Sequence, residues 1–300
     1  MIPDWDTVTV VISDLLHQRH PQVERELSGI LEKHDVPLLT VEGTKDIWIR
    51  DYAPLQIQRG QFIQFRYRPD YLLDRDQHTI TKPAVFRSLP FLRERRHSRL
   101  ILDGGNVVAT SRTAILTQKV FAENPTLTER QIQTRLTEKL NVERLIMIRK
   151  EPYDSIGHSD GMVRFLTDDT VVVNDYRKIS PKFSESVDTA LTNASLRLMR
   201  LPYRPELKQR AGIPSAVGNY ANFLRVGNLI VIPEFGQKDD EEVQRLMATW
   251  MPNAKFESLR CEALAREGGV LNCVTWTIQT SAEKRQRRSR QSPTTAFLAE

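Results

Sequence analysis

Hydrophobic positions change their period repeatedly along the chain. Short apolar runs rich in β-branched residues predict strands, as at 7–12, 36–41 and 171–173. Apolar residues three and four positions apart predict amphipathic helices, one beginning at Pro21 and another covering 128–140. Further strands are predicted at 55–57, 62–65, 100–102, 107–109, 114–117, 145–148, 163–166, 223–225, 229–232 and 274–278, and further helices along the stripes Phe183, Val187, Leu191, Leu198 and Val243, Leu246, Met247, Trp250. This alternation is typical of an α/β fold.

Five polar or glycine-bearing segments punctuate these elements at similar intervals. They are W-I-R-D ending at Asp51, L-D-G-G containing Asp103, G-H-S-D-G containing Asp160, N-Y-A-N-F containing Asn222, and E-G-G-V-L-N-C ending at Cys273. The intervals between these five residues are 52, 57, 62 and 51 positions. Radial repetition of one supersecondary unit brings the same loop of each unit to a common axis. The spacing therefore predicts that the five segments converge on one site.

The composition narrows the class of protein. Of the 300 residues, 40% are hydrophobic and 27% are charged, which excludes collagen-like, low-complexity and wholly disordered chains. No apolar run approaches the roughly 18 residues that a transmembrane helix needs, and the first residues have neither the basic nor the apolar region of a secretory signal. With only Cys261 and Cys273, a disulfide framework is not expected. We therefore expect a cytoplasmic protein with reduced thiols.

Basic residues gather near the C-terminal end. Residues 283–300 contribute +3 of the formal net charge of +5 and show no apolar periodicity. We therefore predict a single domain over 1–282 followed by a disordered basic tail. A solvated terminus is the simpler interpretation of this tail, and contact with RNA or an acidic partner is the alternative. Apart from the apolar stripes assigned to the core, the sequence shows no apolar surface from which an oligomeric state could be predicted.

The residue types in the five segments suit nucleophilic catalysis. Cys273 offers a thiol, and His158 offers a base two positions from Asp160. Asp51 and Asp160 suit a planar cation, because carboxylates bind a guanidinium through charge-assisted, bidentate hydrogen bonds. A bound guanidinium would also lower the pKa of the cysteine. Each residue alone has an ordinary structural interpretation, as a buried thiol, a hydrogen-bonded histidine or a turn aspartate, so the combination carries the hypothesis.

Metal and nucleotide binding have weaker support. His158 and Asp160 lack the Cys and His pairs of a structural zinc site, and the chain has no H-E-x-x-H helix. It has no G-x-x-x-x-G-K-S/T or G-x-G-x-x-G string either. We therefore expect no metal and no organic cofactor.

The five motifs together resemble one known family. In chain order they read W-I-R-D-Y-A-P, L-I-L-D-G-G-N, G-H-S-D-G-M-V-R-F, Y-A-N-F-L-R-V-G-N-L-I-V-I-P-E-F-G and G-G-V-L-N-C-V-T-W. They are similar to the motifs of the agmatine deiminase and bacterial-type peptidylarginine deiminase family, part of the guanidine-modifying superfamily, and span about residues 46–276. The resemblance implies a five-bladed, pseudo-symmetric α/β-propeller of ββαβ-like units with the active site on its axis, in agreement with the spacing of the five segments.

The resemblance also implies a role for each matching residue. Cys273 would be the nucleophile and His158 the general acid and base, while Asp51 and Asp160 would grip the guanidinium. Trp48 and Asp103 would complete the substrate site, Asp103 at the position where the family often has an acid that supports the histidine. The supporting loop residues are Arg50, expected to brace its loop through a salt bridge, together with Asn222, Gly104, Gly105, Gly268 and Gly269. The implied reaction is hydrolytic deimination of a small guanidinium compound to a ureido product and ammonia.

Three positions depart from the agmatine-specific pattern. Asn272 stands where that pattern has a histidine, Tyr52-Ala53-Pro54 replaces T-G-P, and Gly161 replaces an acidic residue. The motifs therefore do not define which substrate tail the pocket binds. Agmatine is the first expectation, with free arginine and peptidyl-arginine as alternatives. An amidinotransferase with the same Cys, His and Asp residues, and a catalytically silent binding protein, are the other interpretations.

Overall fold

The chain folds around five small sheets. The computed structural model describes residues 1–72, 77–92, 95–206, 209–210 and 212–280. Its three-stranded sheets are β17-β1-β2, β3-β4-β5, β6-β7-β8, β9-β10-β11 and β14-β15-β16, while β12 and β13 pair separately. In each three-stranded sheet the central strand is antiparallel to one neighbour and parallel to the other. The same strand arrangement is thus repeated five times.

The strands are short, and their bounds follow the sheets in that order. They are β17 (Trp276–Ile278), β1 (Thr9–Ser13), β2 (Leu38–Val41), β3 (Leu55–Gln58), β4 (Gln61–Arg66), β5 (Arg96–Ile101), β6 (Val108–Ala109), β7 (Thr113–Thr117), β8 (Arg144–Ile148), β9 (Val163–Phe165), β10 (Thr170–Asn174), β11 (Arg197–Leu201), β14 (Leu224–Val226), β15 (Leu229–Glu234), β16 (Lys255–Arg260), β12 (Gln209–Arg210) and β13 (Ile213–Pro214).

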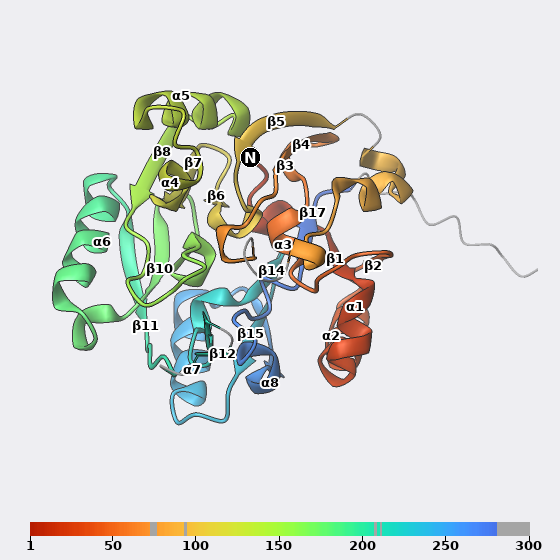
Figure 1. Cartoon of the computed structure of the whole chain (residues 1–300). Helices are drawn as coiled ribbons and strands as arrows, with labels where there is room; N and C mark the ends of the chain where they lie inside the picture. The colour runs from red at the N-terminus through yellow and green to blue at the C-terminus, as the bar shows by residue number, and fades with distance from the viewer. Residues whose placement is uncertain (73–76, 93–94, 207–208, 211, 281–300) are drawn as a thin grey trace, which may run out of the picture.

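Helices connect the parallel strands of four sheets. These connections are α1 (Asp14–Arg19) and α2 (Pro21–Lys33) between β1 and β2, α4 (Lys119–Glu123) and α5 (Glu129–Leu140) between β7 and β8, α6 (Pro181–Asn193) between β10 and β11, and α7 (Asp240–Trp250) between β15 and β16. The described residues between β4 and β5 form only short 3-10 turns, η2 (Asp70–Leu72) among them. Figure 1 shows α2, α5, α6 and α7 at the periphery and the short α3 (Ile49–Tyr52) near the middle.

Local sequence signals explain where the helices begin and end. The Thr128 side chain accepts a hydrogen bond from the Gln131 amide, and the Gln131 side chain accepts one from the Thr128 amide, which forms a capping box at the start of α5. Asn141 ends the same helix in the left-handed conformation, with φ 51°. The apolar stripe of α5 is fully buried against the sheet of β7 and β8, as its spacing predicts.

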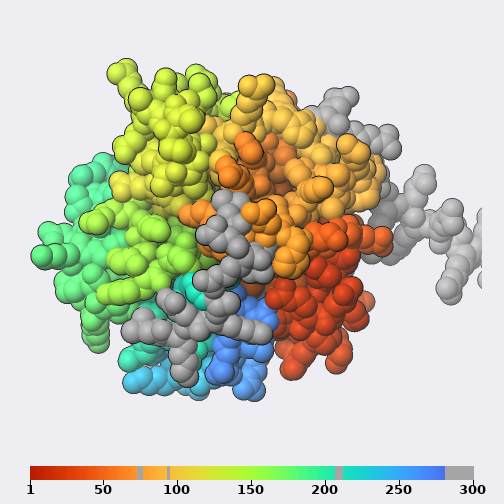
Figure 2. All heavy atoms as spheres, viewed as in Figure 1, coloured from red at the N-terminus to blue at the C-terminus, as the bar shows by residue number. Residues whose placement is uncertain are grey.

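The sheets follow one another around a centre. β17 pairs with β1, so one sheet joins both ends of the described chain. Figure 2 shows successive parts of the chain following each other around the visible face. Near the centre, the 3-10 turn η6 (Gly104–Asn106) packs against α3 and against η7 (Ser159–Gly161), and η7 packs against η9 (Tyr220–Asn222). Turns from different sheets therefore meet at one place.

The predicted α/β class is confirmed, with two local corrections. Leu198 does not continue the helical stripe of Phe183, because α6 ends at Asn193 and Leu198 lies in β11. β16 was not predicted, since its charged and half-exposed residues hide the strand pattern. No helix of the described residues has the length and apolar character needed to cross a membrane. The predicted tail at 283–300 lies outside the described residues.

Candidate active site

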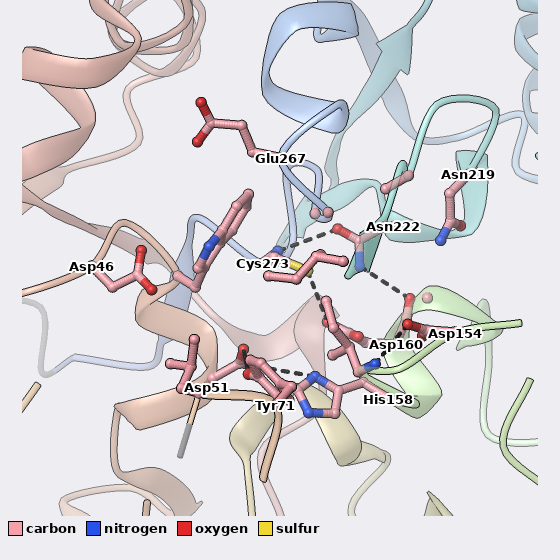
Figure 3. Close-up of a pocket in the computed structure, with 18 residues that line it drawn as sticks. Asp46, Asp51, Tyr71, Asp154, His158, Asp160, Asn219, Asn222, Glu267 and Cys273 are labelled. Carbon is pink, nitrogen blue, oxygen red and sulfur yellow. Dashed lines mark hydrogen bonds and ion pairs between the residues drawn. The ribbon is translucent and has the colours of Figure 1, made fainter. Parts of the chain in front are cut away.

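Residues from all five motif segments meet in one region. Asp51 lies on α3, Asp103 directly before η6, and His158 directly before η7. Asn222 ends η9, and Cys273 lies in the loop that leads to β17. Figure 3 shows Asp51, His158, Asp160, Asn222 and Cys273 gathered around one cavity. The five motif segments, which recur at similar intervals along the sequence, thus lie close together in the folded chain.

The cavity has an empty volume of about 620 Å³, which includes space open to solvent. Its lining includes eight of the predicted residues, Trp48, Asp51, His158, Asp160, Asn222, Gly268, Gly269 and Cys273. The other four, Arg50, Asp103, Gly104 and Gly105, lie outside the lining. The 1% exposure of Asp103 and its position behind His158 fit support of the histidine better than contact with substrate.

Cys273 is held next to two other residues of the site. Its amide donates to Asn222 Oδ1 at 3.3 Å, and its thiol donates to Asp160 Oδ2 at 3.8 Å. Burial raises the pKa of the Cys273 thiol well above its ordinary value, and the Asp160 and Asp51 carboxylates raise it further. The protein's own groups therefore favour the thiol, so the expected thiolate has to be promoted by a cation that binds between the carboxylates.

His158 lies between two carboxylates. Its Nε2 is 3.0 Å from Asp103 Oδ2, and its Nδ1 is 3.4 Å from Asp51 Oδ1. Burial lowers the pKa of His158, but attraction to Asp51 and the hydrogen bond to Asp103 outweigh it and raise that pKa to about 9. Burial raises the pKa of Asp51 to about 7, against the attraction of His158. At neutral pH the imidazole is therefore a cation that can donate a proton.

Two of the predicted glycines allow close packing at the site. A Cβ atom on Gly105 would lie 2.4 Å from Asp51 Oδ1 and 2.8 Å from His158 Nδ1. A Cβ atom on Gly269 would lie 2.6 Å from the Trp48 ring. The Gly105 amide also donates to Asp51 Oδ1 at 3.1 Å. Any side chain at either position would displace a group that lines the cavity.

Arg50 braces its loop in a different way from the one expected. Among the described residues it forms no salt bridge within 4.0 Å. Its guanidinium instead donates to the Asn272 carbonyl at 3.3 Å and to Thr277 Oγ1 at 3.4 Å, and its amide donates to the Cys273 carbonyl at 3.1 Å. The expected salt bridge was wrong, but Arg50 does connect α3 to the segment that carries Cys273.

Several residues at the site were missed by the sequence analysis. Asn272, noted only as a departure from a pattern, donates to Asp160 Oδ2 at 2.6 Å. Tyr71 donates to Asp51 Oδ2 at 3.4 Å and meets the His158 ring edge to face at 6.2 Å. The other missed lining residues are Asp46, Leu72, Asp154, Ile156, Gly161, Ile213, Ala216, Asn219 and Glu267. Gly161, Asn219 and Glu267 lie within the motif segments G-H-S-D-G, N-Y-A-N-F and E-G-G-V-L-N-C, and Asp46 and Ile156 lie close to a motif, whereas the other residues had no sequence signal nearby.

Acidic groups dominate the described lining. It contains the carboxyl groups of Asp46, Asp51, Asp154, Asp160 and Glu267, and no Lys or Arg. Burial raises the pKa of Asp46 to about 6 and also raises that of Asp154. No group of three or more His, Cys, Asp or Glu in the described part of the chain is arranged to hold a metal ion. The cavity is thus built to receive a cation next to a thiol.

Several known proteins are similar to this chain over most of its length. A protein of Streptococcus mutans, provisionally named an agmatine deiminase, is 23% identical over 91% of this chain and 84% of its own length. The structure of an agmatine deiminase from C. jejuni superposes with a TM-score of 0.77 at 19% identity, covering 92% of this chain and 94% of that one. An amidinotransferase from Microseira wollei superposes with a TM-score of 0.64 at 14% identity, covering 93% and 96%. At these identities the two structures show a shared fold.

The family is shown by a match over nearly the whole chain. A family model described as Porphyromonas-type peptidyl-arginine deiminase matches residues 2–278. This range contains all five motifs and every residue of the cavity. It confirms the resemblance stated from the motifs, and the chain therefore belongs to the Porphyromonas-type peptidyl-arginine deiminase family.

Proposed function

We propose that this protein hydrolyses the guanidinium group of agmatine to a ureido group and ammonia. The observation that carries the proposal is the convergence of Cys273, His158, Asp51 and Asp160 on one acidic cavity. The family membership supports the same chemistry, as do the agmatine deiminases that the chain resembles.

The first chemical step is attack by the cysteine. Asp51 and Asp160 would hold the guanidinium nitrogens and leave the guanidino carbon open to Cys273 Sγ. The thiol proton has an acceptor in Asp160 Oδ2, 3.8 Å away. The bound cation offsets the two carboxylates that raise the pKa of the thiol, so binding itself promotes the thiolate.

The later steps depend on His158. Its imidazolium would donate a proton to the departing nitrogen, so that ammonia leaves and a covalent thiouronium intermediate remains. The neutral imidazole would then take a proton from water as the water oxygen bonds to the same carbon. The carbon–sulfur bond breaks, the ureido product leaves, and the thiol is restored. Asp103, hydrogen-bonded to Nε2 at 3.0 Å, would orient the ring throughout, and no metal or organic cofactor takes part in these steps.

The lining favours a substrate with a cationic tail. Free arginine carries an α-carboxylate beside its α-amine, whereas agmatine has the amine alone, and the described lining has five carboxyl groups and no Lys or Arg. Repulsion between like charges across a binding site costs several kcal/mol. We expect kcat/KM for agmatine to exceed that for free arginine by about tenfold or more.

A second cavity favours peptidyl-arginine as the second candidate substrate. It has a volume of about 1030 Å³ and shares Asp154, Gly161, Ala216, Asn219 and Gly268 with the first cavity. A substrate longer than agmatine could therefore extend beyond the cysteine site. Transfer of the amidino group to an amine remains the alternative reaction, because the structure of an amidinotransferase has a fold similar to that of this chain.

Ammonia release by purified protein tests these alternatives. Agmatine, free arginine and an arginine peptide blocked at both ends are compared at equal concentration, with the ureido product identified by mass spectrometry. Glycine or lysine added to the same mixtures reveals amidino transfer as a new guanidino compound. Ammonia from agmatine supports the proposal, whereas transfer without ammonia, or no reaction with any of the three compounds, contradicts it.

The repeated sheets support a five-bladed propeller over residues 1–282. Five sheets have the same strand order, and four have a helix between their parallel strands. The sheet of β3, β4 and β5 departs from a ββαβ unit, since its described connection contains only 3-10 turns. A cytoplasmic location remains our prediction, resting on the free thiols of Cys261 and Cys273.

A further inference from the structure

A buried lysine lies directly behind the histidine. Lys119 begins α4, and its side chain is only 2% exposed. Its Nζ is 3.0 Å from Asp103 Oδ2, the same oxygen that lies 3.0 Å from His158 Nε2. Lys119 belongs to none of the five motifs and does not line the cavity. Its charge nevertheless acts on the acidic partner of His158 through one shared oxygen atom.

Lys119 also contacts a turn that contributes two residues to the cavity lining. Its Nζ lies 3.1 Å from Asp70 Oδ1 and 5.2 Å from the centre of the Tyr71 ring, both residues belonging to η2. Tyr71 in turn donates to Asp51 at 3.4 Å and contacts the His158 ring. One ammonium group thus connects the Asp103–His158 pair with the aromatic side chain that packs on that pair from the cavity side.

The burial of this charge has a clear electrostatic consequence. Burial lowers the pKa of Lys119, but Asp103, Glu123 and Asp70 outweigh it and raise that pKa, so the side chain stays cationic. Burial alone would raise the pKa of Asp103, and Lys119 followed by His158 reverses the effect and lowers it. Asp103 Oδ1 has no hydrogen-bond partner among the described residues. Asp103 is therefore a carboxylate, and the His158 imidazolium continues to lower its pKa when the lysine charge is absent.

We propose that Lys119 is a positioning residue, which holds the Asp103 carboxylate in place against His158 and holds Tyr71 beside Asp51. The proposal rests on the proposed function, in which His158 moves the protons. Lys119 itself touches no reacting atom. Its effect is exerted through the protonation and orientation of His158, and through the closure of the cavity beside the guanidinium carboxylates.

The titratable groups around His158 and Asp103 determine the direction in which Lys119 shifts the pKa of His158. Those that face His158 or Asp103 are Asp51, Asp154, Glu123, Tyr67, Tyr71 and Lys119. Lys119 is the cation of this set that lowers the pKa of His158, whereas Asp51 and Asp103 raise it. Removing the lysine charge must therefore move the pKa of His158 upward, and removing the Asp103 charge must move it downward.

The test compares Lys119→Met with a matched change far from the site. In Lys119→Met we expect the alkaline limb of the kcat/KM profile for agmatine to rise by about one pH unit and the maximum to fall about tenfold or more because the ring is less well oriented. Lys119→Arg, which keeps the charge, should restore most of the limb position. The control is Lys33→Met, because Lys33 is 66% exposed and, within the described part of the chain, forms an ion pair with Glu257 alone; its profile should match the wild type.

A second readout makes the test independent of turnover and of folding. Histidine ring signals are followed by NMR from pH 6 to pH 11 in wild type and in the variants, with His158→Gln identifying the signal. If Lys119→Met does not fold, Lys119→Gln replaces it, because the amide also removes the charge but can still donate a hydrogen bond to Asp103. A higher pKa of His158 in either folded variant supports the proposal, and an unchanged or lower one overturns it. Should wild type release no ammonia, the proposed function fails, while the NMR result still decides this proposal.

Asp70→Asn tests the contact with the Tyr71 turn separately. The Asp70 side chain is 54% exposed, so we expect a rise in KM of a few-fold with kcat nearly unchanged and the pKa of His158 unmoved. A variant with unchanged KM would overturn the part of the proposal that concerns Tyr71. A large loss of kcat with unchanged KM would overturn it as well, because the turn would then act on chemistry rather than on closure.

Discussion

The two cysteines of this chain lie in surroundings that raise both of their pKa values, yet only one faces the cavity. Cys261 is fully buried among apolar side chains, directly before α8 (Glu262–Ala265). Burial raises its pKa far above the ordinary value, with small additions from Glu26 and Glu234. Cys273 is raised by burial and then by Asp160 and Asp51. A cation bound between those carboxylates can offset their effect on Cys273, whereas nothing of the kind can enter around Cys261.

The comparison teaches that burial and reactivity are separate properties. A thiol in an apolar core stays protonated under all ordinary conditions, because no ligand can reach it to change its field. A thiol at an acidic cavity is also protonated, but its state depends on what binds. Substrate charge then becomes part of the catalytic apparatus, and a neutral analogue of the substrate would leave Cys273 a thiol.

The largest expected effect is the loss of the nucleophile. Cys273→Ser should lower the rate of ammonia release from agmatine on the order of 10⁴-fold or more, since an alcohol cannot take the place of the thiolate here. Cys261→Ser should keep activity to within a few-fold. Substantial turnover by Cys273→Ser, or its loss only in Cys261→Ser, would mean that the covalent step is assigned to the wrong residue.

The next effect concerns proton transfer. His158→Ala should lower kcat about a hundredfold or more while KM changes little, because a general acid and base is lost but the two carboxylates remain. His17→Ala is the matched control, since His17 is 73% exposed and contacts only Glu24 at the surface. Steady-state kinetics of both variants check this prediction. A rise in KM with unchanged kcat would make His158 a binding group instead.

A smaller change is expected in the pH profile. The pKa values of about 7 for Asp51 and about 9 for His158 predict a bell-shaped kcat/KM whose limbs belong to the coupled pair. Activity should rise as Asp51 ionises and fall as His158 loses its proton. Asp103→Asn removes a carboxylate that raises the pKa of His158, so its alkaline limb should move to lower pH. An unchanged alkaline limb would show that Asp103 does not influence the pKa of His158.

The smallest effect separates the cysteines by stability. Cys261→Ser places a hydroxyl in an apolar cluster, and we expect it to cost about 1–3 kcal/mol of unfolding free energy. Cys273→Ser, at the cavity, should cost less than about 1 kcal/mol. Urea unfolding of the two variants with equal m-values measures the difference. Equal losses would show that the two surroundings differ less than their contacts indicate.

Much of the fold was readable because its signals are local. The capping box at Thr128 and the stripe Ile132, Leu136, Leu140 define α5 without reference to the rest of the chain. β11 and β16 were not predicted as strands, because their arginine, lysine and glutamate residues interrupt the apolar pattern of a strand. Both strands form because they pair with the central strands of their sheets, β10 and β15, and this pairing joins residues that lie far apart in the sequence.

The site was predictable only where residues lie within a motif. Cys273, His158, Asp51 and Asp160 stand in three of the five motif segments, which recur at similar intervals, so their convergence followed from repetition. Lys119 and Tyr71 lie in ordinary surroundings, and only the folded chain brings them to His158. The direction of the Cys273 pKa was also beyond the sequence, because it depends on burial and on how close two carboxylates lie.

The central claim, that a bound cation activates Cys273, is tested most directly by the ratio of two alkylation rates. A haloacetamidine carries the cationic group of the substrate, and the matched haloacetamide is neutral and almost equal in shape. At about pH 7.5, which lies below the ordinary pKa of a free thiol, we expect the amidine to label Cys273 about a hundredfold faster than the amide or more, relative to the ratio for a free thiol. Peptide mapping should find no label on Cys261, and Asp160→Asn should reduce the ratio. Equal relative rates for the two reagents, or label on Cys261, would contradict the account.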